Sequence, residues 1–155
     1  MKKWIGFVLV IVVLYVSALF VRAELAESKA EMRIVEILTE VASPWDASRM
    51  RREGSEWLLN RAPLSPEKIV ELATNDLGSL REIIKEPTCN YQSGYERGSS
   101  EKRIWAICDI TGRFDKNTAT FKVRLVVEPT TSFSFFGPLS YSLKLNDFMS
   151  IEIEH

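Results

Sequence analysis

An uncharged apolar run near the amino terminus constrains this chain more than any other feature of its sequence. Residues 4–21 read WIGFVLVIVVLYVSALFV, eighteen positions without a charge, with Lys2 and Lys3 before them and Arg22 after them. A helix of that length spans about 27 Å, close to the ~30 Å hydrocarbon core of a bilayer. In lipid such a helix makes all its backbone hydrogen bonds internally and keeps its apolar side chains away from water. In water the same helix would expose apolar surface on every side. The run therefore predicts a membrane-spanning helix.

The predicted anchor is a signal-anchor of residues 1–22 that crosses the membrane once. Positive charge resists translocation, so Lys2 and Lys3 favour a cytoplasmic amino terminus with the rest of the chain outside. The protein is then expected in an inner, cytoplasmic membrane, with its domain in the periplasm or outside the cell. The residues expected within the bilayer are Trp4, Ile5, Val8, Ile11, Val12, Leu14, Leu19 and Phe20.

A cleaved signal peptide is the alternative for the same segment. Val21 and Ala23 are small residues at positions compatible with a cleavage site, which would remove residues 1–23. The apolar run is longer than the usual signal core of about 7–15 residues, and helix-favouring residues follow it without a break. The signal-anchor is therefore preferred, and both alternatives export residues 24–155.

The two cysteines give a second reason to expect export. Cys89 and Cys108 lie in adjacent strand-like segments, TCNYQSGYER and RIWAICDI. A two-residue turn at Gly98 and Ser99 pairs residues whose numbers sum to 197, which places Cys89 directly opposite Cys108. Opposed residues in an antiparallel pair have Cβ atoms about 4.5–5.5 Å apart, near the range that a disulfide needs. We expect a disulfide made in an oxidising compartment, with two reduced, partly buried thiols as the alternative.

Residues 23–42 predict an amphipathic stalk helix that continues the anchor. Its apolar side chains recur at intervals of three and four residues, with charged residues between them. The apolar positions are Ala30, Ile34, Ile37, Leu38 and Val41. We expect this stripe to pack against the chain's own domain, residues 43–155, and a coiled-coil seam with a partner is the alternative.

Further helices are predicted between residues 43 and 87. Ser43-Pro44 has the pattern of a cap followed by proline at the first helical position, which predicts a helix reaching about Leu59. Ser65 and Pro66 repeat that pattern before a short helix over residues 67–73. A third helix is expected after residues 74–76, with the apolar stripe Leu77, Leu80, Ile83 and Ile84, and it should stop at Pro87.

The remainder of the chain predicts β-structure. Apolar and polar residues alternate over residues 118–128 and again over 139–153, and Asp115, Lys116 and Asn117 form a plausible hairpin turn. Each strand has one polar face, so helices must cover the other face. The expected fold is α+β: one N-terminal transmembrane helix, then a two-layer domain of helices packed on a four- to five-stranded antiparallel meander.

One loop suggests a contact with a partner. Phe133, Phe135 and Phe136 lie between two prolines, at positions 129 and 138. They could form an apolar tip that inserts into a partner or a bilayer surface. They could equally belong to an edge strand folded onto the core, because Phe133 and Phe135 alternate with serines.

No pattern in the sequence predicts catalysis. The only histidine is His155, so triads that need a histidine base have no other candidate. None of the seven glycines belongs to a phosphate-binding loop, and two cysteines alone do not make a zinc site. The net charge of −1 gives no basic surface for nucleic acid. We expect no enzyme activity, no catalytic residue, no cofactor and no bound metal.

Binding is the function class that these exclusions leave. The first hypothesis is a membrane-anchored accessory or assembly subunit that binds other membrane or periplasmic proteins. The alternative is a released periplasmic or secreted binding protein or inhibitor without residues 1–23. The layout of one N-terminal helix, further helices and a meander is shared by several families, and no residue motif selects one of them. The oligomeric state is left open.

Overall fold

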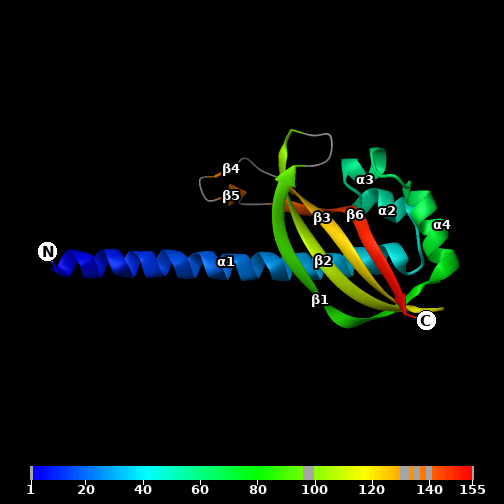
Figure 1. Cartoon of the computed structure of the whole chain (residues 1–155), viewed down its shortest axis with the longest axis horizontal. Coiled ribbons are helices and arrows are strands. Elements are labelled where there is room, and N and C mark those ends of the chain that lie inside the picture. The colour runs from blue at the N-terminus through cyan, green and yellow to red at the C-terminus, as the bar shows by residue number, and fades with distance from the viewer. Residues whose placement is uncertain (1, 96–99, 130–132, 135–136, 139–140, 155) are drawn as a thin grey trace.

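The computed structural model describes residues 2–95, 100–129, 133–134, 137–138 and 141–154. Side chains within these ranges are described from residue 10 onward, except at 23, 129, 133–134 and 137–138. Figure 1 shows one long helix whose first half projects from a domain built of a curved sheet and shorter helices.

Helix α1, Lys2–Ala42, joins the predicted anchor and the predicted stalk without a break. Among the residues that the structure describes, no helix is long and apolar enough to cross a membrane. The predicted span is therefore unsupported by this structure and stays a prediction.

The second half of α1 is a core element of the domain. Ala30, Ile34, Ile37, Leu38 and Val41 are all buried in the main apolar cluster, which confirms that the stripe packs against the chain's own domain. The four-stranded sheet lies across this half of the helix (Figure 1).

Polar contacts also hold α1 where it enters the domain. The Tyr91 hydroxyl donates to the Ala26 carbonyl at 3.0 Å, and the Lys29 ammonium donates to the Tyr141 carbonyl at 3.0 Å. The same ammonium lies 3.8 Å from the centre of the Tyr141 ring. Burial raises the pKa of Tyr91, with a hydrogen bond to Tyr141 as a further cause. Tyr91 is therefore a neutral donor to α1 at physiological pH.

The chain turns after α1 in a way that differs from the prediction. Helix α2 is Ala47–Glu53, and its cap is Asp46, whose carboxylate accepts from the Ser48 and Arg49 amides. Ser43-Pro44 instead lies in a tight turn with a cis peptide bond, where the Asp46 amide donates to Val41 at 2.9 Å. The predicted helix start at Ser43 was therefore wrong. Asp46 caps the helix instead, because its carboxylate accepts hydrogen bonds from amides that a helix start leaves without a partner.

Two short helices follow α2. Helix α3, Glu56–Asn60, begins at a new cap, Ser55, so the single helix predicted as far as Leu59 is two helices. Helix α4, Pro66–Asp76, begins where predicted, with Ser65 as the cap and Pro66 in the first turn. Helices α2, α3 and α4 gather at the end of the domain away from the projecting half of α1 (Figure 1).

The helix predicted after residue 76 is instead a strand. α4 ends at Asp76, Gly78 has a φ of +76°, and β1 then runs over Leu80–Tyr95. Pro87 lies within this strand, where the β1–β2 pairing shifts register between Lys85 and Thr88. β1 is an edge strand of the sheet, the position in which a proline costs no ladder hydrogen bond.

The sheet is an antiparallel meander, as predicted. Its order is β1-β2-β3-β6, with β2 Lys102–Phe114, β3 Thr118–Pro129 and β6 Tyr141–Glu154. The turn predicted at residues 115–117 joins β2 to β3. A separate two-stranded pair is formed by β4, Phe133–Ser134, and β5, Gly137–Pro138. The α+β fold with a four-stranded antiparallel sheet is thus confirmed.

The predicted cysteine register is correct. Cys89 pairs with Cys108, and from Thr88 to Tyr95 the numbers of paired residues sum to 197, as predicted. A disulfide joins the two cysteines, whose Cα atoms lie 4.1 Å apart. Both residues belong to the buried core, so the crosslink lies between the sheet and α1.

Aromatic rings fill the core near the end of α1. The Trp45 ring stacks on Phe114 with 6.1 Å between centroids, and Phe121 contacts Phe114 and Phe148 at 5.6 and 6.0 Å. The Trp45 indole donates to the Gly78 carbonyl at 2.8 Å. This hydrogen bond fixes the turn that follows α4, and with it the position of α4 beside the sheet.

Candidate protein-binding surfaces

The described residues contain no cluster of histidine, cysteine, aspartate or glutamate able to hold a metal ion. Both cysteines are used in the disulfide. The described surface carries apolar grooves beside the edges of the sheet.

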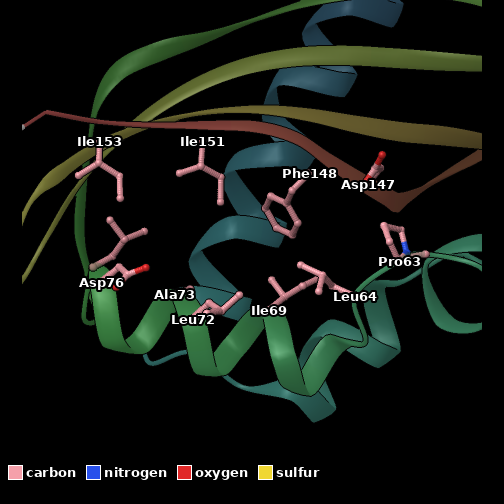
Figure 2. A pocket seen from close by; sticks show the side chains of 12 residues that line it. Pro63, Leu64, Ile69, Leu72, Ala73, Asp76, Asp147, Phe148, Ile151 and Ile153 are labelled. Carbon is pink, nitrogen blue, oxygen red and sulfur yellow. The ribbon is translucent and has the colours of Figure 1, made fainter.

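The most confined of these grooves lies between α4 and β6 and has a volume of about 300 Å³. Figure 2 shows the apolar side chains of the two elements pointing toward each other across it. Its lining residues are Ala62, Pro63, Leu64, Ile69, Leu72, Ala73, Asp76, Leu77, Asp147, Phe148, Ile151 and Ile153. We call this set the α4/β6 groove.

Several side chains of the α4/β6 groove are exposed to solvent. Leu64, Leu72 and Ile151 keep 43%, 41% and 43% of their surface accessible, which is high for large aliphatic residues that face one another. Contiguous exposed apolar surface of this kind is typical of a binding site.

The two aspartates of the groove lie differently. Asp76 closes one end of it, beside Ile153, whereas the Asp147 carboxylate points away from it (Figure 2). Burial raises the pKa of Asp147, and the nearby charge of Arg124 partly offsets that increase. The interior of the groove is therefore apolar, with one carboxylate at its mouth.

β6 itself is half covered along its free edge. The Ser55 amide donates to the Leu145 carbonyl at 2.7 Å, and Gly54 forms a parallel bridge to Leu145. The Ser55 hydroxyl also donates to the Asn146 side chain at 2.8 Å. Residues 149–154 continue the strand beyond this contact, and β6 is the last strand in the sheet order.

A second surface lies along α1, between the two edges of the sheet. Met32 is 66% exposed and lines two open hollows, one shared with β6 through Leu143 and one shared with β1 through Pro87. Both hollows are wider and more open than the α4/β6 groove, and charged residues such as Lys29 and Glu31 border them. This surface is less confined than the α4/β6 groove.

A group of ion pairs centred on Arg33 holds α1 against α2. The Arg33 guanidinium on α1 forms ion pairs with Glu36 and with Glu53 at the end of α2. Arg33 also donates to the Leu143 carbonyl at 3.4 Å, which ties α1 to β6. Only 8% of the Glu53 side chain is exposed, so this pair is largely removed from water.

The residues predicted to span a membrane divide into two groups. Ile11, Val12, Leu14, Leu19 and Phe20 lie on α1 with exposed side chains. Trp4, Ile5 and Val8 lie in the same helix, and their side chains are outside the described part.

The predicted phenylalanine contact is not described in full. Phe133 belongs to the backbone of β4, whereas Phe135 and Phe136 lie outside the described residues. The β4–β5 pair lies at the end of the domain from which α1 projects (Figure 1).

Sequence analysis did not anticipate the α4/β6 groove. The sequence pattern predicts a short helix over residues 67–73 and a strand over residues 139–153, and neither prediction indicates that the two elements face each other across a groove. The surplus of apolar residues on both elements was the available signal, because neither element has a further layer beyond it to cover them.

Comparison with known proteins adds no family to these observations. No protein-family model, curated protein or solved structure matches this chain.

Proposed function

We propose that this protein is a membrane-anchored accessory subunit that binds another protein through its extracytoplasmic domain. The anchor is the first half of α1, with the amino terminus in the cytoplasm, and the domain lies in the periplasm or outside the cell. Its work is binding rather than catalysis, with no cofactor or metal. The observation that carries the proposal is the abrupt change of environment along α1, from exposed apolar side chains to core positions.

The exposed half of α1 supports the membrane anchor. Every side chain described between Val10 and Arg22 is exposed, and the large apolar ones keep between 42% and 68% of their surface accessible. An apolar helix exposed on all sides is unfavourable in water and favourable in lipid. The uncharged run of residues 4–21 has the length that a bilayer requires.

The disulfide supports an extracytoplasmic domain. Disulfides persist in oxidising compartments and are rare where thiols are kept reduced. The Cys89–Cys108 crosslink lies in the domain and not in the exposed half of α1, as expected if only the domain is exported.

The α4/β6 groove supports a binding role. It lies at the end of the domain farthest from the projecting half of α1, where a bilayer at the amino terminus leaves it accessible (Figure 1). Apolar concave surfaces with few polar groups are the usual form of binding sites.

Membrane fractionation tests the anchor. Membranes from cells that express the full chain are washed with alkaline carbonate, and the chain in each fraction is weighed by mass spectrometry. We expect the uncleaved chain in the membrane pellet. The double variant V12R/L14R, which places two charges in the run, should release it, because each central arginine costs about 2.5–3.5 kcal/mol on the insertion scale.

Leu25→Arg is the matched control. Leu25 is 65% exposed on the same helix, but it follows the uncharged run, so this variant should stay in the pellet. Full-length chain in the soluble fraction would contradict the anchor. A soluble chain that starts near Glu24 would favour the released binding protein instead.

A further inference from the structure

We propose that the open edge of β6 takes up an extended segment of a partner protein in which basic and apolar residues alternate. The segment would add a strand beside residues 149–154, with its apolar side chains in the α4/β6 groove. This inference rests on the proposed binding function and specifies the partner's chemistry at that site.

The backbone of β6 is available for such pairing along half its length. β6 is the outermost strand of the sheet, and within the described residues it pairs only with β3 over residues 149–154. The contact from Gly54 and Ser55 covers the edge only near Leu145. An exposed edge of this kind presents unpaired N–H and C=O groups, which an extended peptide can use.

The two faces of this edge differ in chemistry. Ile151 and Ile153 lie on the side that lines the α4/β6 groove together with Phe148. Glu152 and Glu154 alternate with them, are exposed, and face away from the groove, because successive side chains of a strand point to opposite sides. An added strand would therefore have every second side chain over apolar surface and the others beside glutamates.

The residues directly opposite these glutamates carry no charge, and Lys122, opposite Ser150 on the same face, pairs with Asp109 at 3.6 Å. On β3, Glu152 lies opposite Thr120 and Glu154 lies opposite Thr118, neither of which is charged. Residues directly opposite across a strand pair lie about 4.5–5.5 Å apart, close enough for a charge pair to stabilise the added strand. Lysine or arginine on the added strand would supply the missing charge.

The end of α4 beside the groove carries charges of both signs and does not set the charge of the added segment. Asp76 lies at one end of the groove, across from Ile153 (Figure 2). The nearby Lys116 ammonium donates to the Thr74 and Asn75 carbonyls at the end of α4. The requirement for basic residues therefore rests on Glu152 and Glu154, which face the other side of the added strand from Asp76.

The same charges argue against a second copy of this chain as the occupant. Pairing of two β6 edges would bring Glu152 and Glu154 of both copies together, and like charges across a strand pair are destabilising. An anionic lipid surface would meet the same repulsion.

The test measures peptide binding to the full chain in micelles of an uncharged detergent, by fluorescence anisotropy. The probe is a labelled ten-residue peptide of alternating valine and lysine, and its counterpart alternates valine and glutamate. We expect the lysine peptide to bind at least tenfold more tightly than the glutamate peptide. A third peptide, the lysine sequence with every backbone nitrogen methylated, should not bind because it cannot donate to the strand edge.

Variants of the chain localise the site. E152K/E154K should weaken binding of the lysine peptide at least tenfold and strengthen binding of the glutamate peptide. Glu86→Lys, an exposed glutamate on the opposite edge strand, is the matched control and should bind as the unaltered chain does. Unaltered circular dichroism of both variants shows that the domain is folded.

Equal binding of the lysine and glutamate peptides would overturn the proposal, and so would retained binding of the methylated peptide. An equal effect of Glu86→Lys and E152K/E154K would also overturn it. Failure of the proposed function is distinguishable: a chain that washes off membranes yet binds the lysine peptide refutes the anchor and keeps this site. An anchored chain that binds none of the peptides refutes the site alone.

Discussion

The Cys89–Cys108 disulfide closes a hairpin whose strands are already paired, and its contribution to stability can be calculated from the loop it closes. The two cysteines are 19 residues apart in sequence. In the chain-entropy model a closed loop of that size stabilises the folded state by about 3 kcal/mol at 25 °C. For a chain of this length that corresponds to a melting temperature lower by roughly 6–12 °C when the bond is absent.

The assay compares oxidised protein with protein reduced in denaturant and refolded under reductant. Tryptophan fluorescence follows thermal unfolding in the same detergent, and Trp45 reports on the core because it is buried there. The C89A/C108A variant should melt close to the reduced protein. Adding reductant to that variant is the control, and it should change nothing.

A refuting result is easy to recognise. If reduced and oxidised protein melt within about 2 °C of each other, the loop-closure account of this bond is wrong. Alkylation of both thiols in untreated native protein would refute the bond itself, because both sulfurs would then be free.

Three further perturbations are expected to give clear results. Glu53→Ala should lower the free energy of unfolding by about 2 kcal/mol in a urea titration, because it removes the buried partner of the partly buried Arg33. Glu36→Ala, at the exposed pair, should change it by less than about 0.5 kcal/mol. Burial raises the pKa of Asp147, so its contribution to stability is complete below its ordinary pKa of 3.8 and is lost as the pH rises through the folded-state pKa. Asp147→Asn should flatten that decline in the free energy of unfolding, measured from pH 3 to 7. An unchanged slope would contradict burial as the cause. Gly78→Ala should cost about 1–2 kcal/mol by the same urea titration, because φ at this position is +76°, and a neutral result would show that the turn adapts.

The parts of the fold that sequence predicted correctly are those governed by local chemistry. Ser65 and Pro66 start α4 because the cap and the fixed φ of proline act within one helical turn. The pairing of Cys89 with Cys108 follows from a short connection between two strands, which leaves little choice of register.

The predictions of secondary structure are wrong where contacts between residues distant in sequence determine the local structure. Leu77, Leu80 and Ile83 have helical spacing, yet β1 pairs with β2 from Leu80 onward, and the sheet overrides the local pattern. The sequence pattern predicts a helix stop at Pro87, whereas the structure places this proline in an irregular edge strand, which accommodates it as well.

The α4/β6 groove could not be predicted, because the residues that line it are far apart in the sequence. Ile69 and Ile151 line the same groove although about eighty residues lie between them. Each residue alone has the pattern of an ordinary core position. Only the placement of α4 against the last strand of the sheet shows that these side chains face each other and keep part of their surface in solvent.

If the first half of α1 is the membrane anchor proposed above, the unbroken course of this helix sets the distance between the bilayer and the proposed binding site. With the bilayer surface at Arg22, the helix rises twenty residues to its end at Ala42, which is about 30 Å at 1.5 Å per residue. The α4/β6 groove lies at that far end of the domain (Figure 1). A partner anchored in the same membrane would need an extended linker of about nine residues to span that distance before it reached β6. In the anchored protein that we propose, α1 would therefore hold the groove at this distance from the bilayer, which favours tall or unanchored partners over short juxtamembrane loops.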